Sequence, residues 1–308
     1  MKSMAFARRN AKEILRDPLS FVFCLGFPVL LLAAFRVIQH NAGEMWMSPV
    51  ELIPGVAVFS LAFDLLFMVL LVARDRGGAF LSRLFNAPMR TSDFILGYVL
   101  PCFVLGAAQL VITYLAGAAI FLCPDGAVQA GELLFASKTV DYTAYPPVTV
   151  PVTVKAPIAG VPLAVLAGLP ALLFFLFCGV LLGIALNDRA APGVSSALIT
   201  GAGFLGGCWM PLDTMGKFET VCRCLPFYPA VVLSRAAFCG GVETGEILVS
   251  LLTVMLWAVA AFVAATLAFR RVQKGTALRR GHLRTPAVRL IGWRGTLGAF
   301  AESLACAV

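Results

Sequence analysis

Few residues of this chain are of the types that carry out chemistry, and they are scattered. Only two histidines are present, His40 and His282, and they lie far apart in the sequence. Nine cysteines are present, but the closely spaced pair Cys222 and Cys224 does not have the ligand spacing of a zinc site. We therefore predict no catalytic site, no metal site and no enzyme activity in this chain.

One ionisable residue lies inside a long apolar run. Asp64 stands in SLAFDLLFMV, ten residues before Arg74, which corresponds to about 15 Å along a helix and a position near the middle of a membrane. Burying an aspartate there costs roughly 2.5 to 3.5 kcal/mol, so its side chain is expected to face protein or water. Two interpretations stay open. Asp64 is part of a transport path or dimer seam, or it has a structural role as a protonated carboxyl or in an interhelical hydrogen bond to Gln109 or Tyr114.

The elements that position these residues follow from a strongly apolar composition. The chain is 60% hydrophobic and 13% charged, with a mean hydropathy of +0.91, whereas globular domains are about 25% charged. Six runs are long enough to cross a membrane as helices of about 20 residues. They are 19–38, 52–73, 99–122, 158–186, 190–210 and 247–269. We predict an all-α membrane protein with six transmembrane helices.

The basic residues indicate orientation in the membrane. The net charge is +8, and most of the 24 lysines and arginines fall in the N-terminal segment, residues 74–90, Arg189 and the C-terminal tail. Six spans place these segments on one side, and basic residues concentrate on the cytoplasmic side. We predict a multi-pass cell-membrane protein with both termini in the cytoplasm. No basic stretch is interleaved with stacking aromatics, so no nucleic-acid partner is expected.

The N-terminal segment has the pattern of an amphipathic helix. Met4, Ala7, Ala11 and Ile14 recur at helical spacing, and the basic residues lie largely on another face. Such a helix would lie in the membrane interface, with its apolar stripe in lipid and its cations toward anionic headgroups. A solvated, charged N-terminus is the alternative reading.

A second amphipathic segment separates the second and third predicted spans. In DRGGAFLSRLFNAPMRTSDFILGY, residues 75–98, apolar side chains recur at helical spacing from Phe80 to Phe85, and Pro88 ends the turn. Thr91, Ser92 and Asp93 then offer N-cap oxygens to the next helix. We predict a short helix joined closely to two transmembrane helices.

At these residues the sequence resembles the permease subunits of type-2 ATP-binding-cassette exporters, the ABC-2 permease family. The match runs through a charged pair, a glycine, F-L-x-R-L, a proline and D-F-I-L-G-Y. A second match covers residues 203–238, where a glycine-rich span is followed by short outer helices and a Leu-Pro. The resemblance covers most of residues 1–272 and leaves 273–308 as a basic cytoplasmic tail.

The resemblance implies a membrane subunit of an ATP-driven exporter. No G-x-x-x-x-G-K-[ST] loop occurs, so a separate ABC ATPase, in two copies, is expected to bind the ATP and Mg²⁺. The short helix at 78–90 would dock in that ATPase, although a loop lying on lipid is the alternative. The coupling residues implied by the resemblance are Phe80, Leu81, Arg83, Leu84, Pro88 and Arg90.

The resemblance also implies a second permease, identical or related. The transport path or dimer seam is assigned to Asp64 together with Gly201, Gly203 and Gly206 of the fifth span. The expected substrate is hydrophobic or amphipathic: a drug-like molecule, a lipid or a peptide. The alternative function is an ion-coupled secondary transporter that uses Asp64.

Three further expectations concern the connections. Residues 123–157 form a long outer insert, in which the alternating run 146–154 favours a small hairpin or cap. The tail 273–308 either lies on the membrane surface or is disordered. A disulfide is left open among four outer cysteines, which are Cys208, Cys222, Cys224 and Cys239.

Overall fold

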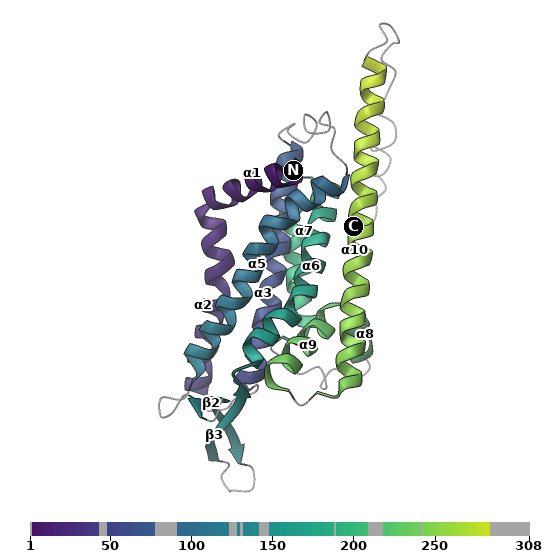
Figure 1. Cartoon of the computed structure of the whole chain (residues 1–308). Helices are drawn as coiled ribbons and strands as arrows, with labels where there is room; N and C mark the ends of the chain where they lie inside the picture. Colours follow the sequence, from purple (N-terminus) through teal and green to yellow (C-terminus); the bar gives the residue numbers. More distant parts are fainter. Residues whose placement is uncertain are drawn as a thin grey trace, which may run out of the picture. The chain divides into compact units, whose positions relative to one another are not determined.

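The structure is mostly helical, with one small sheet (Figure 1). This computed structural model describes residues 2–42, 48–77, 91–122, 128–129, 132–141, 148–187, 189–208, 218–240 and 242–283. The helices up to the sheet are α1 (Lys2–Arg16), α2 (Pro18–Ala42), α3 (Pro49–Gly77) and α5 (Thr91–Phe121). The sheet comprises β1 (Val128–Gln129), β2 (Glu132–Asp141) and β3 (Val148–Pro157). After it come α6 (Gly160–Ala185), α7 (Ala191–Leu205), α8 (Phe218–Cys224), α9 (Phe227–Cys239) and α10 (Thr244–Leu283).

Within these ranges four helices are long and apolar enough to cross a membrane. They are the described parts of α3, α5, α6 and α10, which correspond to the second, third, fourth and sixth predicted spans. Two other apolar helices are shorter than these four. The apolar part of α2 is Cys24–Gln39, and α7 has 15 residues. The described residues therefore contain four helices that are long and apolar enough to be membrane spans, and the count of six remains a prediction.

α7 is shorter than the predicted fifth span because its last turn is stopped by glycine. The helix ends at Leu205, and Gly207 adopts a φ of 61°. This left-handed conformation is typical of the glycine that follows a helix. The sequence prediction of a helix through residue 210 was therefore too long for the described part of the chain.

The central element is α3, which packs against α2, α5, α6, α7 and α9. In its apolar window 78% of the residues are buried inside the protein, compared with 22% for α10. The core around α3 is thus closed on most sides, and α10 leaves most of its surface for lipid.

The contact between α3 and α6 depends on two glycines. A side chain at Gly179 would meet Met68, and a Cβ at Gly183 would lie 2.7 Å from Val72 Cβ and 3.0 Å from the Val69 carbonyl oxygen. The sequence around them, GVLLG, has the small-x-x-x-small spacing that lets membrane helices approach closely. Sequence analysis missed this signal.

α1 is the amphipathic helix that the sequence predicts, and it is confirmed as a helix from Lys2 to Arg16. It stops before Pro18 because the residue preceding a proline is disfavoured in helical conformation. Part of its apolar face lines a groove of about 480 Å³ beside α5. Residues of α1 on this groove include Met4, Ala7, Ala11, Ile14 and Leu15.

The sheet lies at the opposite end of the bundle from α1 (Figure 1). β2 and β3 pair antiparallel from Glu132 with Pro157 to Asp141 with Val148, and β1 pairs with the start of β2. The hairpin expected in this insert is therefore present. In this sheet β3 pairs only with β2, and such an edge strand accommodates Pro151.

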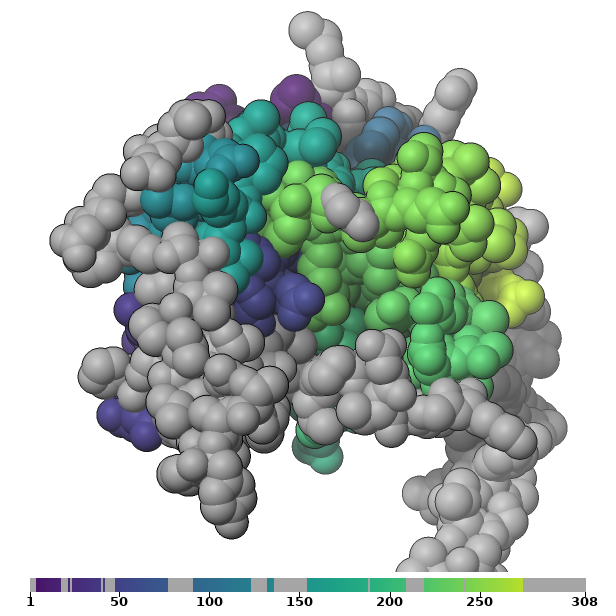
Figure 2. Space-filling model, turned by 90° about the horizontal axis from the view of Figure 1, so that it is seen from below, coloured from purple at the N-terminus to yellow at the C-terminus, as the bar shows by residue number. Residues whose placement is uncertain are grey.

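The sheet is attached to the bundle by aromatic packing. Phe135 of β2 is fully buried, with its ring centroid 6.0 Å from that of Phe238 on α9, and Tyr114 of α5 lies 5.4 Å from the same ring. In Figure 2, which views this end, green α9 lies beside the dark blue start of α3. Arg235 of α9 donates hydrogen bonds to the carbonyls of Glu51 and Gly207. These contacts join the ends of α3, α5, α7 and α9.

The short helices α8 and α9 occupy the interval between the fifth and sixth predicted spans, where the sequence predicts short helices. The chain divides into two compact units, residues 1–270 and 271–308. The following sections concern the first unit.

Candidate functional site

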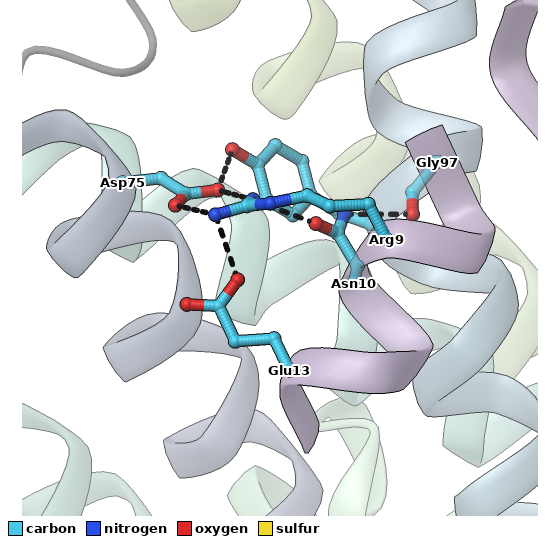
Figure 3. A network of polar contacts seen from close by, with 6 residues as sticks. Arg9, Asn10, Glu13, Asp75 and Gly97 are labelled. Carbon is cyan, nitrogen blue, oxygen red and sulfur yellow. Dashed lines mark hydrogen bonds and ion pairs between the residues drawn. The ribbon is translucent and has the colours of Figure 1, made fainter. Parts of the chain in front are cut away.

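The candidate site is a junction at which α1 crosses the end of α3 and the start of α5. Asp75 lies two residues before the end of α3, and Gly97 and Tyr98 lie in the second turn of α5. α1 crosses both ends, with Arg9 and Asn10 directed toward them (Figure 3). We call Phe6, Arg9, Asn10, Asp75, Gly97 and Tyr98 the helix junction.

The segment that links the two helix ends of the junction along the chain is the one to which the sequence assigns coupling. Residues 78–90 connect α3 to α5 and lie outside the described residues. All six predicted coupling residues fall on this segment: Phe80, Leu81, Arg83, Leu84, Pro88 and Arg90. Their assignment therefore remains a prediction, whereas the two helix ends that flank them are described.

An ion pair forms the centre of the junction. Arg9 donates from Nη1 to Asp75 Oδ2 at 2.7 Å and from Nη2 to Oδ1 at 3.0 Å, a two-point contact between planar groups (Figure 3). Nη2 of Arg9 also lies 2.7 Å from Oε2 of Glu13. The side chain of Asp75 is 3% exposed and that of Arg9 is 37% exposed, so the carboxylate is inside and the guanidinium reaches the surface.

The guanidinium group of Arg9 keeps its positive charge. Burial lowers the pKa of Arg9, but the hydrogen bond and the charge of Asp75 outweigh that effect and raise the pKa above its ordinary value. Arg9 therefore stays charged at any physiological pH.

α5 enters the junction through Tyr98 and Gly97. The Tyr98 hydroxyl, which is buried, donates to Asp75 Oδ2 at 2.8 Å, and Asn10 Nδ2 donates to the carbonyl of Gly97 at 3.0 Å. A side chain at Gly97 would collide with the ring of Phe6, which packs edge-on against Tyr98 at 4.9 Å. α1 is thus held to α5 by polar and apolar contacts together.

α6 is joined to the same end of the bundle by the neighbouring arginine. Arg76 donates to the carbonyl of Ile184 and, at 3.1 Å, to Oδ1 of Asn187. Ile184 lies in the last turn of α6, whose carbonyls have no partner within the helix. A basic side chain is well placed there. The consecutive residues Asp75 and Arg76 therefore connect α3 to α1, α5 and α6.

The contacts of the junction hold helices together. Among the described residues no group of three or more histidine, cysteine, aspartate or glutamate side chains is arranged to hold a metal ion. The junction fixes both ends of the 78–90 segment to helices whose positions are set by buried contacts. A displacement of that segment would therefore be passed to α3 and α5 together.

The comparison with known protein families agrees with this reading. Residues 2–137 match the family model described as the ABC-2 type transporter. This segment is similar to the ABC-2 type transporter family. The resemblance seen in the sequence is thereby confirmed from α1 into β2. The second motif, residues 203–238, lies beyond the matched segment. No curated protein matches the chain.

The ABC-2 segment contains the whole helix junction. The junction therefore lies in the part of the chain that matches the membrane domain of ABC-2 type transporters. Sequence analysis missed the roles of Arg9, Asn10 and Tyr98. Asn10 is fully buried on a helix otherwise expected to lie at a membrane surface, and the sequence alone carries no signal of that burial.

The structure places Asp64 in the ABC-2 segment facing α2 and α5. Its Oδ1 accepts a hydrogen bond from the thiol of Cys24 at 3.2 Å, and the same sulfur lies 2.9 Å from Oε1 of Gln109. Gln109 in turn donates to the carbonyl of Ser60 at 2.9 Å. The predicted partner Gln109 is thus in the same cluster, but the direct partner is Cys24, which was not anticipated.

The three glycines predicted to form the seam lie in α7 or directly after it. They are outside the matched segment and differ in environment. Gly203 and Gly206 are buried within the chain, whereas the closest atom to a Cβ at Gly201 would be the flexible end of Leu205, 4.0 Å away. Gly201 is therefore available to another subunit, and the other two glycines serve packing inside this one. Their assignment to a seam remains a prediction.

The disulfide that the sequence left open among the outer cysteines is not formed in the structure. Cys208, Cys222, Cys224 and Cys239 are all free. Cys208 is buried at the end of α7, and Cys239 donates to the carbonyl of Val50 at 2.9 Å, so these two thiols are held at separate places. Cys222 and Cys224, which are close in the sequence, do not pair either.

Proposed function

We propose that this chain is the membrane subunit of an ATP-driven exporter that moves a hydrophobic or amphipathic molecule out of the cytoplasm. In this proposal the α1 end of the bundle faces the cytoplasm and the sheet faces outward. The basic residues near α1, Arg74 and Arg76 at the end of α3, and Arg189 beyond α6 support this orientation.

The observation that carries the proposal is the helix junction. It couples the two helices that flank residues 78–90, so that a force on this segment moves α3 and α5 as one body. α3 is also the most enclosed of the four long helices, and its movement would reach α6 and α7 through their shared contacts. An ATPase that grips the 78–90 segment therefore has a rigid path into the bundle.

The energy source in this proposal is a separate protein. The chain has no phosphate-binding glycine loop, so ATP and Mg²⁺ would be bound by two copies of an ABC ATPase. Closure of the ATPases on nucleotide would shift the membrane subunits between inward-open and outward-open states.

The double substitution Arg83→Glu with Leu84→Asp tests this coupling. It reverses one charge and removes apolar contact on the 78–90 segment, so we expect loss of copurification with the partner ABC ATPase. The measurement is the amount of ATPase recovered with affinity-purified permease in membranes that contain equal amounts of each variant.

Arg189→Glu is the matched control, because it reverses a charge expected on the same side of the membrane but outside the segment. It is expected to leave the recovered amount unchanged. Retention of the ATPase by the double variant would disprove the coupling role of residues 78–90.

A second permease copy is proposed on the exposed face of α7. Only one stripe of this helix is buried, formed by Ala191, Ser195, Ile199, Ala202 and Gly203. The remaining surface includes Ser196 and Thr200, both exposed, and the open Gly193 and Gly201. Small and hydroxyl-bearing residues are typical of helix contacts in membranes. α3 has little free surface for this purpose.

Ser196→Trp tests the dimer. A bulky side chain on this face is expected to convert the dimer to a monomer, as measured by light scattering on the chromatographed protein with correction for bound detergent. Val259→Trp, on the exposed face of α10, is the matched control and should leave the mass unchanged. An unchanged dimer in both variants would place the seam elsewhere.

A further inference from the structure

Asp64 lies at the inner end of a cavity that the junction does not use. The cavity has a volume of about 70 Å³ and lies between α1, α3 and α5. It extends along α3 from the exposed Arg74 to the buried Asp64, ten residues and about 15 Å apart. Its volume admits a few water molecules or a small polar head group.

The carboxyl at this inner end lacks the partners that a buried acid normally has. The Asp64 side chain is 1% exposed, and its Oδ2 accepts no hydrogen bond from any described residue. Its Oδ1 has only the thiol of Cys24, a weak donor whose single hydrogen is shared with Gln109. Buried polar atoms are nearly always paired, so Oδ2 of Asp64 is an acceptor available to a bound donor.

A glycine on α5 leaves room for the Asp64 carboxyl. A Cβ at Gly106 of α5 would lie 2.8 Å from Asp64 Oδ2 and would also collide with Leu172. The missing side chain at Gly106 therefore leaves room for the carboxyl.

The cavity wall combines an apolar surface with negative charge. Phe67, Leu70, Leu71 and Leu105 form its sides. Glu13 and Asp17 lie nearer its opening, where Arg74 is the cation that the described lining contains. Glu13 is already paired with Arg9, and Arg74 is a full 15 Å along the helix from Asp64. The occupant that fits an apolar passage ending at a carboxyl is a cation with an apolar body.

We propose that this cavity binds the ammonium group of an amphipathic amine, with Asp64 Oδ2 accepting its hydrogen bonds and the apolar wall contacting its hydrocarbon part. The three N–H donors of a primary ammonium supply what the carboxyl lacks. Phe67 adds an aromatic ring to the wall, and such rings attract ammonium groups. This inference deepens the proposed function by assigning a substrate class, and it rests on that function only for the claim that the amine is exported.

Binding is tested on the full chain in lipid nanodiscs without any ATPase, with tritiated 2-phenylethylammonium as the probe. We expect saturable binding that octylammonium displaces and that 2-phenylethanol, the neutral analogue, does not. Asp64→Asn keeps the shape of the side chain and removes its charge, and it should weaken binding at least tenfold. Glu243→Gln, which neutralises an exposed acid far along the chain, is the matched control and should bind as the wild type does.

The analogue experiment uses only the wild-type protein, so it decides the question even if Asp64→Asn fails to fold. Absence of saturable binding, equal displacement by 2-phenylethanol, or undiminished binding by a folded Asp64→Asn protein would overturn the proposal. Failure of ATPase copurification would instead contradict the proposed function and leave these binding results unaffected.

Two lipid compositions identify the source of the amine. Nanodiscs of phosphatidylglycerol alone are compared with nanodiscs that also contain phosphatidylethanolamine. Displacement of the probe by phosphatidylethanolamine would identify a membrane aminolipid as the occupant. Unchanged binding would identify an amine that enters from solution.

Discussion

Replacing Gly183 with leucine is expected to separate α3 from α6 and to destabilise the protein by about 3 kcal/mol, at the upper end of the usual cost of overpacking. The new side chain would meet Val72 Cβ and the Val69 carbonyl oxygen. Neither atom can rotate away, because the backbone of α3 fixes the positions of both a Cβ and a carbonyl oxygen. The measurement is the thermal unfolding temperature of purified protein in detergent, together with its elution profile.

Gly26→Leu on α2 is the control for this change. A Cβ there would have only Val22 of its own helix within 4 Å, so the added side chain meets no other element. Both substitutions gain the same helix propensity, and the difference between them isolates the packing cost. Equal unfolding temperatures for the two variants would show that the close contact between α3 and α6 contributes little.

This helix contact illustrates what periodicity in a sequence does and does not predict. The apolar run at 158–186 correctly predicted α6, because length and hydropathy are properties of one segment. The partner of Gly183 is more than one hundred residues away, and hydropathy carries no information about it. Only the GVLLG spacing pointed to a close contact, and it does not say with which helix.

The same division applies to the candidate site. The sequence correctly predicted the helices α1, α3 and α5 and the family whose model matches this part of the chain. It did not predict that Arg9 would bind Asp75, 66 residues away, because a basic residue on an interfacial helix is equally well explained by lipid headgroups. The junction depends on the angle at which α1 crosses α3 and α5, which three-dimensional packing decides.

Asp64 shows where sequence reasoning was half correct. The cost of an intramembrane carboxyl identified it as a residue that needs a partner, and Gln109 is indeed in its cluster. Nothing in the sequence marks Cys24 as a polar partner, because free cysteines usually behave as small apolar residues. The thiol instead lies between Asp64 and Gln109, and that position follows from how α2 packs against α3 and α5.

Replacing Asp75 with leucine is expected to destabilise the protein by about 2 to 3 kcal/mol and to uncouple ATP hydrolysis from transport. The largest part of that cost is the Tyr98 hydroxyl, which is fully buried and would lose its acceptor. Arg9 contributes less, because its partly exposed guanidinium keeps Glu13 and water. The measurements are thermal unfolding and the ratio of substrate moved to ATP hydrolysed in liposomes that contain the partner ATPase.

The double variant Arg9→Leu with Asp75→Leu separates stability from coupling. The double variant no longer places the Arg9 guanidinium beside an apolar side chain, so it should be more stable than Asp75→Leu alone, as found when buried ion pairs are replaced by apolar side chains. The transport ratio should stay low, because no polar contact then fixes α1 to the end of α3. Glu13→Gln retains the Arg9–Asp75 pair and should match the wild type in both measurements. A double variant that regained both stability and coupling would show that the junction is a packing contact and that force reaches α3 and α5 without it.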